Sequence, residues 1–247
     1  MISRRRFIAA GTSGLLLAGC DKFDRDPQFK GLLRSAEKLT MKTQRLIGRD
    51  ALAREYSEAD LSPIFRSNGT RMPNTPAYTR HLAENFANWR LTVDGLVARP
   101  LSIPLAALRS LPYRTQITRH DCVEGWSAIG KWHGVPLARI LDAAGLSPRA
   151  NYIVFHCADF FGPYPYYESI DLIDAFHPQT ILAWGMNNRL LPVPNGAPLR
   201  LRVERQLGYK HAKYVERIEA VASLADVHGG KGGYWEDRGD YQWYAGI

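Results

Sequence analysis

Alternating hydrophobic and polar residues mark several stretches of the chain as β-strands. Residues 89–97 alternate around Asp94 and Gly95, a turn signal that predicts a strand, a turn and a second strand. Residues 113–118 alternate in the same way, whereas residues 152–157 are mostly apolar and predict a buried strand. Further strands are expected at 181–184, 199–203 and 214–221.

Short helices are predicted between these strands. Ser102 and Pro104 stand in the order that is typical of the start of a helix. A second helix is expected over residues 136–144, closed by Gly145, and a third over residues 170–176. Short strands mixed with short helices predict an α+β fold with mixed sheets.

The N-terminal part of the chain has a different texture. Residues 21–80 are polar and rich in charge, with only short apolar runs, and we expect them to be irregular: a tether followed by an arm that wraps the domain without a core of its own. We therefore divide the chain into a signal peptide at 1–19, a tether and polar arm at 20–60, and a folded domain at 61–247.

Length and charge narrow the classes of function. A chain of 247 residues, of which 45% are hydrophobic, is long enough to bury a sizeable core. It carries 32 Lys and Arg against 24 Asp and Glu, a net charge of +8. No Lys/Arg-rich tail interrupts the sequence, so we expect no nucleic-acid partner, whereas small molecules that bear phosphate fit the modest basic excess.

The first residues resemble a twin-arginine export signal. Arg4 and Arg5 form the basic pair, Phe7 follows, and the apolar run over 9–18 is too short and too interrupted to span a bilayer permanently. This route carries proteins that are already folded, commonly because a cofactor is inserted in the cytoplasm. The signal therefore predicts a cofactor and a periplasmic location.

Cys20 ends the sequence Leu17-Ala18-Gly19-Cys20, which resembles a bacterial lipobox. We expect lipidation of Cys20 and attachment of the mature protein to a membrane. The alternative is an ordinary signal peptide that is cut nearby, with Cys20 discarded or left free.

Cys122 and Cys157 are the cysteines that remain after Cys20. A disulfide between them is one alternative in an oxidising compartment. Cys122 follows Arg119 and His120, cationic neighbours that favour a thiolate. Three interpretations are open at this point: a structural cysteine, a nucleophile with His120 as its base, and a soft thiolate ligand for a thiophilic metal.

The sequence around Cys122 resembles that of a known family. Cys-Val-Glu-Gly-Trp at 122–126 and Trp-x-Gly-Val-Pro-Leu at 132–137 are similar to motifs of the sulfite-oxidase-type molybdopterin-binding oxidoreductases. The likeness covers residues 60–247 and is closest to the bacterial branch of the periplasmic methionine-sulfoxide reductase catalytic subunit. Asn195 stands where sulfite oxidases have His, which selects this branch. Other similar segments are 166–171, 177–183, 195–200 and 208–213.

The resemblance implies a set of site residues. Cys122 would ligate molybdenum, as both the metal-binding and the catalytic-site residue, and a group of further residues would bind the cofactor. Arg200 would grip its phosphate, Lys213 would add a charge and His211 would donate a hydrogen bond. The cofactor-binding residues are Asn68, Cys157, Asn195, Arg200, His211 and Lys213.

Two of these roles rest on position alone. Asn195 would bond the pterin, and Cys157 stands where the reductase branch has a Thr that contacts the cofactor, although a thiol is a weaker hydrogen-bond partner. In the alternative without a cofactor role, Arg200 and Lys213 would be solvated strand residues, and Asn68 would form a turn before Gly69.

The family reaction is two-electron oxygen-atom transfer at molybdenum, and a sulfoxide is a candidate substrate. No Cys-x-x-Cys-His haem motif is present, so we expect no haem and a separate electron-transfer partner such as a membrane cytochrome. We expect a monomer without the immunoglobulin-like dimerisation domain of sulfite oxidases. Tyr164, Tyr166 and Tyr167 favour aromatic packing, so no catalytic acid is assigned.

Two functions from other classes stay open. A metal-free, lipid-anchored binding or assembly protein that keeps the fold would contain no molybdenum. A cysteine-dependent hydrolase would act without metal and would lose activity on alkylation of Cys122.

Overall fold

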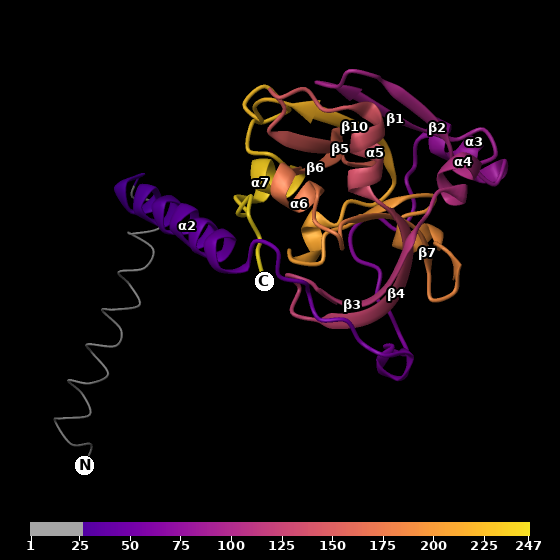
Figure 1. Cartoon of the computed structure of the whole chain (residues 1–247), viewed down its shortest axis with the longest axis horizontal. Helices are drawn as coiled ribbons and strands as arrows, with labels where there is room; N and C mark the ends of the chain where they lie inside the picture. The colour runs from indigo at the N-terminus through magenta and orange to yellow at the C-terminus, as the bar shows by residue number, and fades with distance from the viewer. Residues whose placement is uncertain (1–26) are drawn as a thin grey trace, which may run out of the picture. The chain divides into compact units, whose positions relative to one another are not determined.

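The computed structural model describes residues 27–247, so the predicted signal peptide and Cys20 lie outside the described residues (Figure 1). The chain divides into two compact units between Arg49 and Asp50. Across residues 27–247, no helix combines the length and the hydropathy needed to cross a membrane.

Helix α2, Pro27–Gly48, belongs to the first unit. The prediction of an irregular tether was wrong for these residues. After Pro27 the segment holds no proline, and most of its residues are good helix formers such as Leu, Lys, Arg, Gln and Ala. Helix propensity therefore decides its structure, despite the polar composition.

The second unit contains two five-stranded sheets built on the orders β2-β1-β10-β5-β6 and β3-β4-β7-β8, with β9 paired to β7. The β1–β10 pair is parallel and all other pairs are antiparallel. The strands are β1 Arg90–Gly95, β2 Leu101–Pro104, β3 Arg114–Asp121, β4 Ser127–Pro136, β5 Tyr152–Phe161, β6 Tyr164–Asp171, β7 Ile181–Met186, β8 Arg189–Leu190, β9 Arg200–Arg202 and β10 Val215–Val221.

Short helices connect the strands, so the predicted α+β class with mixed sheets is confirmed. The α-helices of this unit are α3 Pro76–Ala83, α4 Leu105–Ser110, α5 Leu137–Ala144, α6 Leu172–Ala175 and α7 Tyr234–Gly239. The 3-10 helices are η1 Glu58–Asp60, η2 Val193–Asn195 and η3 Gly208–Lys210. Helix α5 ends as predicted, with Gly145 in the left-handed region at φ 70°.

The Asp94-Gly95 signal does not form the tight hairpin that the sequence predicted. Strand β1 ends at Gly95, and its antiparallel partner β2 begins only at Leu101. A Cβ on Gly95 would lie 2.3 Å from the carbonyl oxygen of Ala220, so glycine here serves the close approach of β10. Ser102 and Pro104 lie in β2, and the predicted helix begins one residue later, at Leu105.

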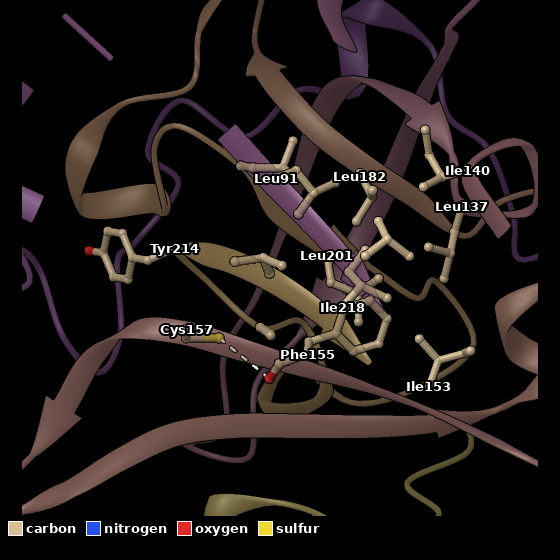
Figure 2. Close-up of a cluster of buried hydrophobic side chains, with 14 of the residues drawn as sticks. Leu91, Leu137, Ile140, Ile153, Phe155, Cys157, Leu182, Leu201, Tyr214 and Ile218 are labelled. Atoms are coloured by element: carbon tan, nitrogen blue, oxygen red, sulfur yellow. Dashed lines mark hydrogen bonds between the residues drawn. The ribbon is translucent and has the colours of Figure 1, made fainter. Parts of the chain in front are cut away.

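The hydrophobic core joins the two sheets and α5. Leu91 and Ile218 come from the first sheet, Leu182 and Leu201 from the second, and Leu137 from α5 (Figure 2). All of them are fully buried. Side chains of this size stabilise a fold by about 1.5–3 kcal/mol each when buried, so this cluster fixes how the sheets meet.

The segment that follows Arg49 packs on the second sheet without forming a core of its own. Tyr56 donates its backbone N–H to Ile117 of β3 at 2.9 Å. The side chain of Gln179 accepts from the N–H of Ala53 at 2.8 Å and donates to the carbonyl of Ala53 at 3.0 Å. These contacts lead the chain toward Asn68.

A buried ion cluster holds η3 and α7 against β6. The Lys210 ammonium lies 2.6 Å from Glu168 and 2.6 Å from Glu236, and all three side chains are almost fully buried. Burial raises the pKa of Glu168 well above its ordinary value, and Glu236 raises it further. The Lys210 ammonium acts in the opposite direction, because it lies beside both carboxyl groups.

Replacing Lys210 by Met should destabilise the fold by about 3–5 kcal/mol, because it leaves buried carboxyl groups without their cation. The matched control is Lys231→Met, which removes an exposed pair with Asp240 and should cost less than about 1 kcal/mol. Urea unfolding of both variants measures the difference. Equal losses of stability would show that the buried cluster does not hold the fold.

Candidate active site

One cavity of about 250 Å³ brings together loops from distant parts of the second unit. It lies where the segment 68–70 and the β3–β4 turn meet the end of β5, strand β6, β9, η3 and α7. Its lining is Asn68, Gly69, Thr70, Val123, Glu124, Asp159, Phe161, Tyr166, Arg200, Gly208, Tyr209, His211, Lys213, Trp235 and Tyr241. Asn68, Arg200, His211 and Lys213 were predicted as site residues.

Cys122 lies beside this cavity, directly after β3 in the turn that joins β3 to β4. Its backbone N–H donates to Trp126 at 2.9 Å, and the N–H of Gly125 donates back to Cys122 at 3.0 Å. Gly125 has φ +84°, which a glycine adopts without strain. The strand and turn therefore place the thiol at the end of the hairpin.

Asn68 contacts Cys122 across 54 positions of sequence: its amide Nδ2 lies 3.2 Å from Cys122 Sγ. Burial raises the pKa of the Cys122 thiol, while the backbone amides of Glu124 and Val123 and the Asn68 side chain act in the opposite direction. A thiolate at this position can therefore accept hydrogen bonds from these amides.

The cationic neighbours expected from the sequence do not act on Cys122. Arg119 points to Asp121, at 2.9 Å, and its side chain is largely exposed. His120 is buried on the other face of β3, and its Nδ1 accepts from Arg202 Nη1 at 3.0 Å. Arg119 and His120 are adjacent in β3 and point to opposite faces of the strand, so they cannot both face Cys122.

His120 is also poorly placed to serve as a base for Cys122. Burial and then the charge of Arg202 hold the pKa of His120 well below its ordinary value, so the ring is neutral. Its Nδ1 is already occupied by Arg202, and no hydrogen bond joins the two side chains in the part of the chain that the structure describes. The nucleophile–base pair of a hydrolase is therefore not assembled.

Arg200 is a buried cation that no carboxylate neutralises directly. It is only 3% exposed, and it donates Nη1 to the carbonyl of Asn195 at 2.9 Å and Nη2 to that of His211 at 3.3 Å. Its Nε has no partner, and within residues 27–247 no carboxylate oxygen pairs with it. Burial lowers the pKa of Arg200 to about 9, so it remains charged at neutral pH. This geometry suits an anion.

His211 does not have the donor role that was predicted for it. Its Nε2 lies 3.0 Å from the carbonyl oxygen of Gln206, which can only accept, so Nε2 carries the proton. Burial and the charge of Arg202 keep the pKa of His211 well below its ordinary value, and the neutral ring leaves Nδ1 as an acceptor without a partner. A Cβ at Gly208 would lie 2.5 Å from the His120 ring, so glycine lets η3 come this close.

Lys213 fastens the segment that carries Asn68. Its ammonium donates to the carbonyls of Asn68 at 2.7 Å, of Pro194 at 3.1 Å, and of Thr70. An ammonium has three protons, so these carbonyls occupy all of them and leave none for a phosphate. Burial, with the charge of Arg200, lowers the pKa of Lys213 to about 7.

Asn195 and Cys157 do not line the cavity. Asn195, in η2, reaches the site through its carbonyl oxygen, which accepts a hydrogen bond from Arg200. Cys157 is buried in the hydrophobic core, with Sγ 3.9 Å from the carbonyl of Phe155 (Figure 2). Cys122 and Cys157 are both free thiols, so the disulfide alternative is wrong.

Asp159 is a cavity residue that the sequence reasoning missed. It is 2% exposed, and its Oδ1 has no hydrogen-bond partner. Burial raises its pKa to about 6, while a hydrogen bond from Thr70 and the charge of Lys213 oppose the shift. The predicted strand stopped at residue 157, whereas β5 continues to Phe161, and the available signal was an acidic residue near the end of a buried strand.

Tyr166 lines the cavity but donates its hydroxyl to the carbonyl of Tyr209 at 2.8 Å. Tyr167 bonds Asp237, and the Tyr164 ring packs under Arg238 at 3.5 Å. The packing role that was favoured for these tyrosines agrees with the contacts, and none of the three is singled out as an acid.

Comparison with known proteins gives a consistent picture. Residues 78–228 match the family model described as the oxidoreductase molybdopterin binding domain. An Azospira oryzae protein provisionally named as a protein-methionine-sulfoxide reductase subunit is 44% identical over 160 residues, 65% of this chain and 56% of its own length. A Campylobacter jejuni protein-methionine-sulfoxide reductase catalytic subunit is 34% identical over 152 residues, 56% of this chain and 51% of its own length.

A solved structure supports the fold. The sulfane dehydrogenase SoxCD from Paracoccus pantotrophus is similar with a TM-score of 0.52 and 23% identity, over 56% of this chain and 39% of that chain. The predicted sulfite-oxidase-type fold is therefore confirmed. The chain spans about half the length of the curated relatives it matches.

The Asp159 carboxyl should give the protein a measurable pH dependence of stability. Its pKa in the folded protein, about 6, is above the ordinary 3.8, so the folded state binds more protons between these values. Stability should thus fall as pH rises through this window, by up to about 3 kcal/mol from this group. Asp159→Asn should remove that fall.

Urea unfolding at pH 4 and pH 7 measures the effect. Asp142→Asn, at an exposed position of α5, is the matched control and should keep the wild-type pH dependence. An unchanged pH dependence in Asp159→Asn would mean that the carboxyl is ionised throughout the window.

Proposed function

The chain belongs to the family of oxidoreductase molybdopterin-binding domains, and on this premise we propose that it is a molybdenum enzyme that reduces sulfoxides. The observation that carries the proposal is the pairing, around one cavity, of an amide-supported thiol, Cys122, with a buried cation, Arg200, that lacks an anion. Molybdopterin offers a thiophilic metal at one end and a phosphate at the other, and so satisfies both groups.

The residues of this chain fit the cofactor. Cys122 would hold the metal, and Asn68 would brace the bound sulfur through its amide. Arg200 would hold the phosphate, because its guanidinium is forked, buried and short of an anionic partner. His211 Nδ1, also without a partner, would accept a hydrogen bond from the organic part of the cofactor. Lys213 would act indirectly, by fixing the Asn68 segment.

When bound, the cofactor would supply the chemistry of two-electron oxygen-atom transfer to this site. The protein positions the substrate, excludes water and supplies protons. A sulfoxide that becomes a sulfide and water takes up two electrons and two protons. Asp159 is a carboxyl in the cavity wall whose pKa, about 6, lets part of the population hold a proton near neutral pH. We propose it as a proton source for this step.

A sulfoxide is the favoured substrate for two reasons. Both relatives compared above carry the words protein-methionine-sulfoxide reductase in their names. Asn195 also departs from the His of sulfite oxidases, as the resemblance indicated. We therefore propose methionine sulfoxide, free or in a protein, as the substrate class.

Export and electron supply complete the proposal. The twin-arginine pair and Cys20 support a periplasmic protein that is lipid-anchored to a membrane. The name of the Campylobacter jejuni relative, a catalytic subunit, supports a separate electron-transfer partner. We propose a membrane cytochrome for this role.

Molybdenum content and coordination test the ligand assignment. Protein from a molybdenum-competent host should contain about one molybdenum per chain, and X-ray absorption of Cys122→Ser should show one sulfur fewer around the metal. Cys157→Ala is the control and should keep every sulfur, because Cys157 lies in the core. An unchanged sulfur count in Cys122→Ser would rule out Cys122 as the ligand. Wild-type protein without molybdenum would favour the metal-free binding protein.

Activity tests the reaction. With a reduced viologen dye as electron donor, the wild-type protein should convert methionine sulfoxide in a peptide to methionine. Arg200→Met should lose most of this activity together with its molybdenum, because the cofactor phosphate loses its cation. Sulfite oxidation with a dye acceptor is the counter-assay. Turnover of sulfite and none of the sulfoxide would overturn the proposed substrate.

A further inference from the structure

Helix α2, Pro27–Gly48, separates apolar and basic residues onto opposite faces. We propose that this helix is a membrane-surface element that lies in the plane of an anionic lipid bilayer. The proposal concerns where the enzyme is held and does not depend on its reaction.

The apolar face is built on a seven-residue spacing. Leu39 and Leu46 are 66% and 87% exposed, and Ile47 is 82% exposed. Residues seven apart on an α-helix differ by only about 20° in direction, so Leu39 and Leu46 share one face, and Ile47, about 80° from Leu39, borders it. Three large apolar side chains are thus left in water on a single helix.

The polar residues on that face are satisfied within the helix. The hydroxyl of Thr40 donates to the carbonyl of Ala36 at 3.0 Å, and that of Thr43 donates to Leu39 at 2.9 Å. A hydroxyl that is bonded to its own helix does not need water, so this face can enter an apolar phase without leaving a polar group unbonded.

The opposite face is basic. Lys38, Lys42 and Arg45 follow one another at spacings of four and three residues, which places them together on the helix. The whole helix contains five basic residues and a single acidic one, Glu37. A strongly apolar face opposed by a basic face is the pattern of helices that bind anionic lipid surfaces.

A second copy of the chain is a poorer occupant of the apolar face. A coiled coil needs large apolar residues at a second heptad position, but the residues four after Leu32 and Leu39 are Ala36 and Thr43. Pairing two copies would also bring basic faces of like charge close together. A bilayer, in contrast, supplies an apolar interior and negative headgroups at once.

The position of the helix fits this role. Cys20 precedes Pro27 by seven residues in the sequence. A lipid chain alone binds membranes weakly and reversibly, whereas a chain combined with a basic apolar helix gives stable attachment. If Cys20 is not lipidated, the helix provides the attachment by itself.

Vesicle flotation tests the proposal with the full chain carrying Cys20→Ser, so that no acyl chain contributes. The probes are vesicles of phosphatidylcholine alone and vesicles that also contain phosphatidylglycerol. The protein should bind the anionic vesicles at least tenfold more tightly. The double variant Leu39→Ala/Leu46→Ala should lose about tenfold or more in this binding, because apolar area is removed while alanine preserves the helix.

Two further variants complete the test. Lys38→Glu/Lys42→Glu should abolish the preference for anionic vesicles. Leu190→Ala, at a position of β8 that is 60% exposed, is the matched control and should bind like the parent. Unchanged binding in the leucine double variant would overturn the proposal, and so would equal binding to both kinds of vesicle. A dimer in sedimentation that the double variant abolishes would assign the face to a second copy instead.

Discussion

The charge of Arg200 in a dry part of the molecule is the constraint around which the site is built. Arg200 and Arg202 are two residues apart on β9 and share one face of the strand. Both guanidinium groups pack over the Trp132 ring, with the guanidinium carbons 5.1 and 4.3 Å from the ring centre. Glu204 pairs with Arg202 at 2.5 Å, whereas Arg200 donates hydrogen bonds only to carbonyls among the described residues. A buried cation is costly unless an anion accompanies it. The proposed cofactor phosphate would supply the anion that Arg200 lacks.

The two sheets and their loops give the site its dimensions. The β3–β4 hairpin carries Cys122 to one side of the cavity, and β9 carries Arg200 to another. Lys213 holds the segment from Asn68 to Thr70 in the cavity wall through hydrogen bonds to its carbonyls. Lys210, in η3, binds Glu168 of β6 and Glu236 of α7. Both Lys213 and Lys210 are buried cations surrounded by oxygen acceptors. Loops joined in this way can position a cofactor without a binding helix.

Local sequence predicted the parts of this arrangement that depend on local rules. Cap and turn signals were sufficient for helix α5, because they follow from neighbouring residues. The roles of Cys122 and Arg200 came from the family resemblance and stay predictions, although Arg200 lines the cavity and Cys122 lies beside it. The role of Lys213 was not predictable, since its three carbonyl partners come from segments far apart in sequence. Asp159 was missed because the extra length of β5 comes from pairing with β6, which no local pattern showed. Helix α2 was missed for the opposite reason: composition was given more weight than propensity.

The same charges argue for a neutral substrate. If the cofactor phosphate neutralises Arg200, the other basic groups beside the cavity are already engaged: Arg202 is paired with Glu204, Lys213 donates to three carbonyls and lies near the Asp159 carboxyl, and His211 is neutral. An anion such as sulfite would then find no partner to repay its desolvation. A sulfoxide is uncharged, and its apolar substituents can pack against Phe161 and Trp235 of the lining. These charges favour an uncharged substrate and so support the sulfoxide proposed above.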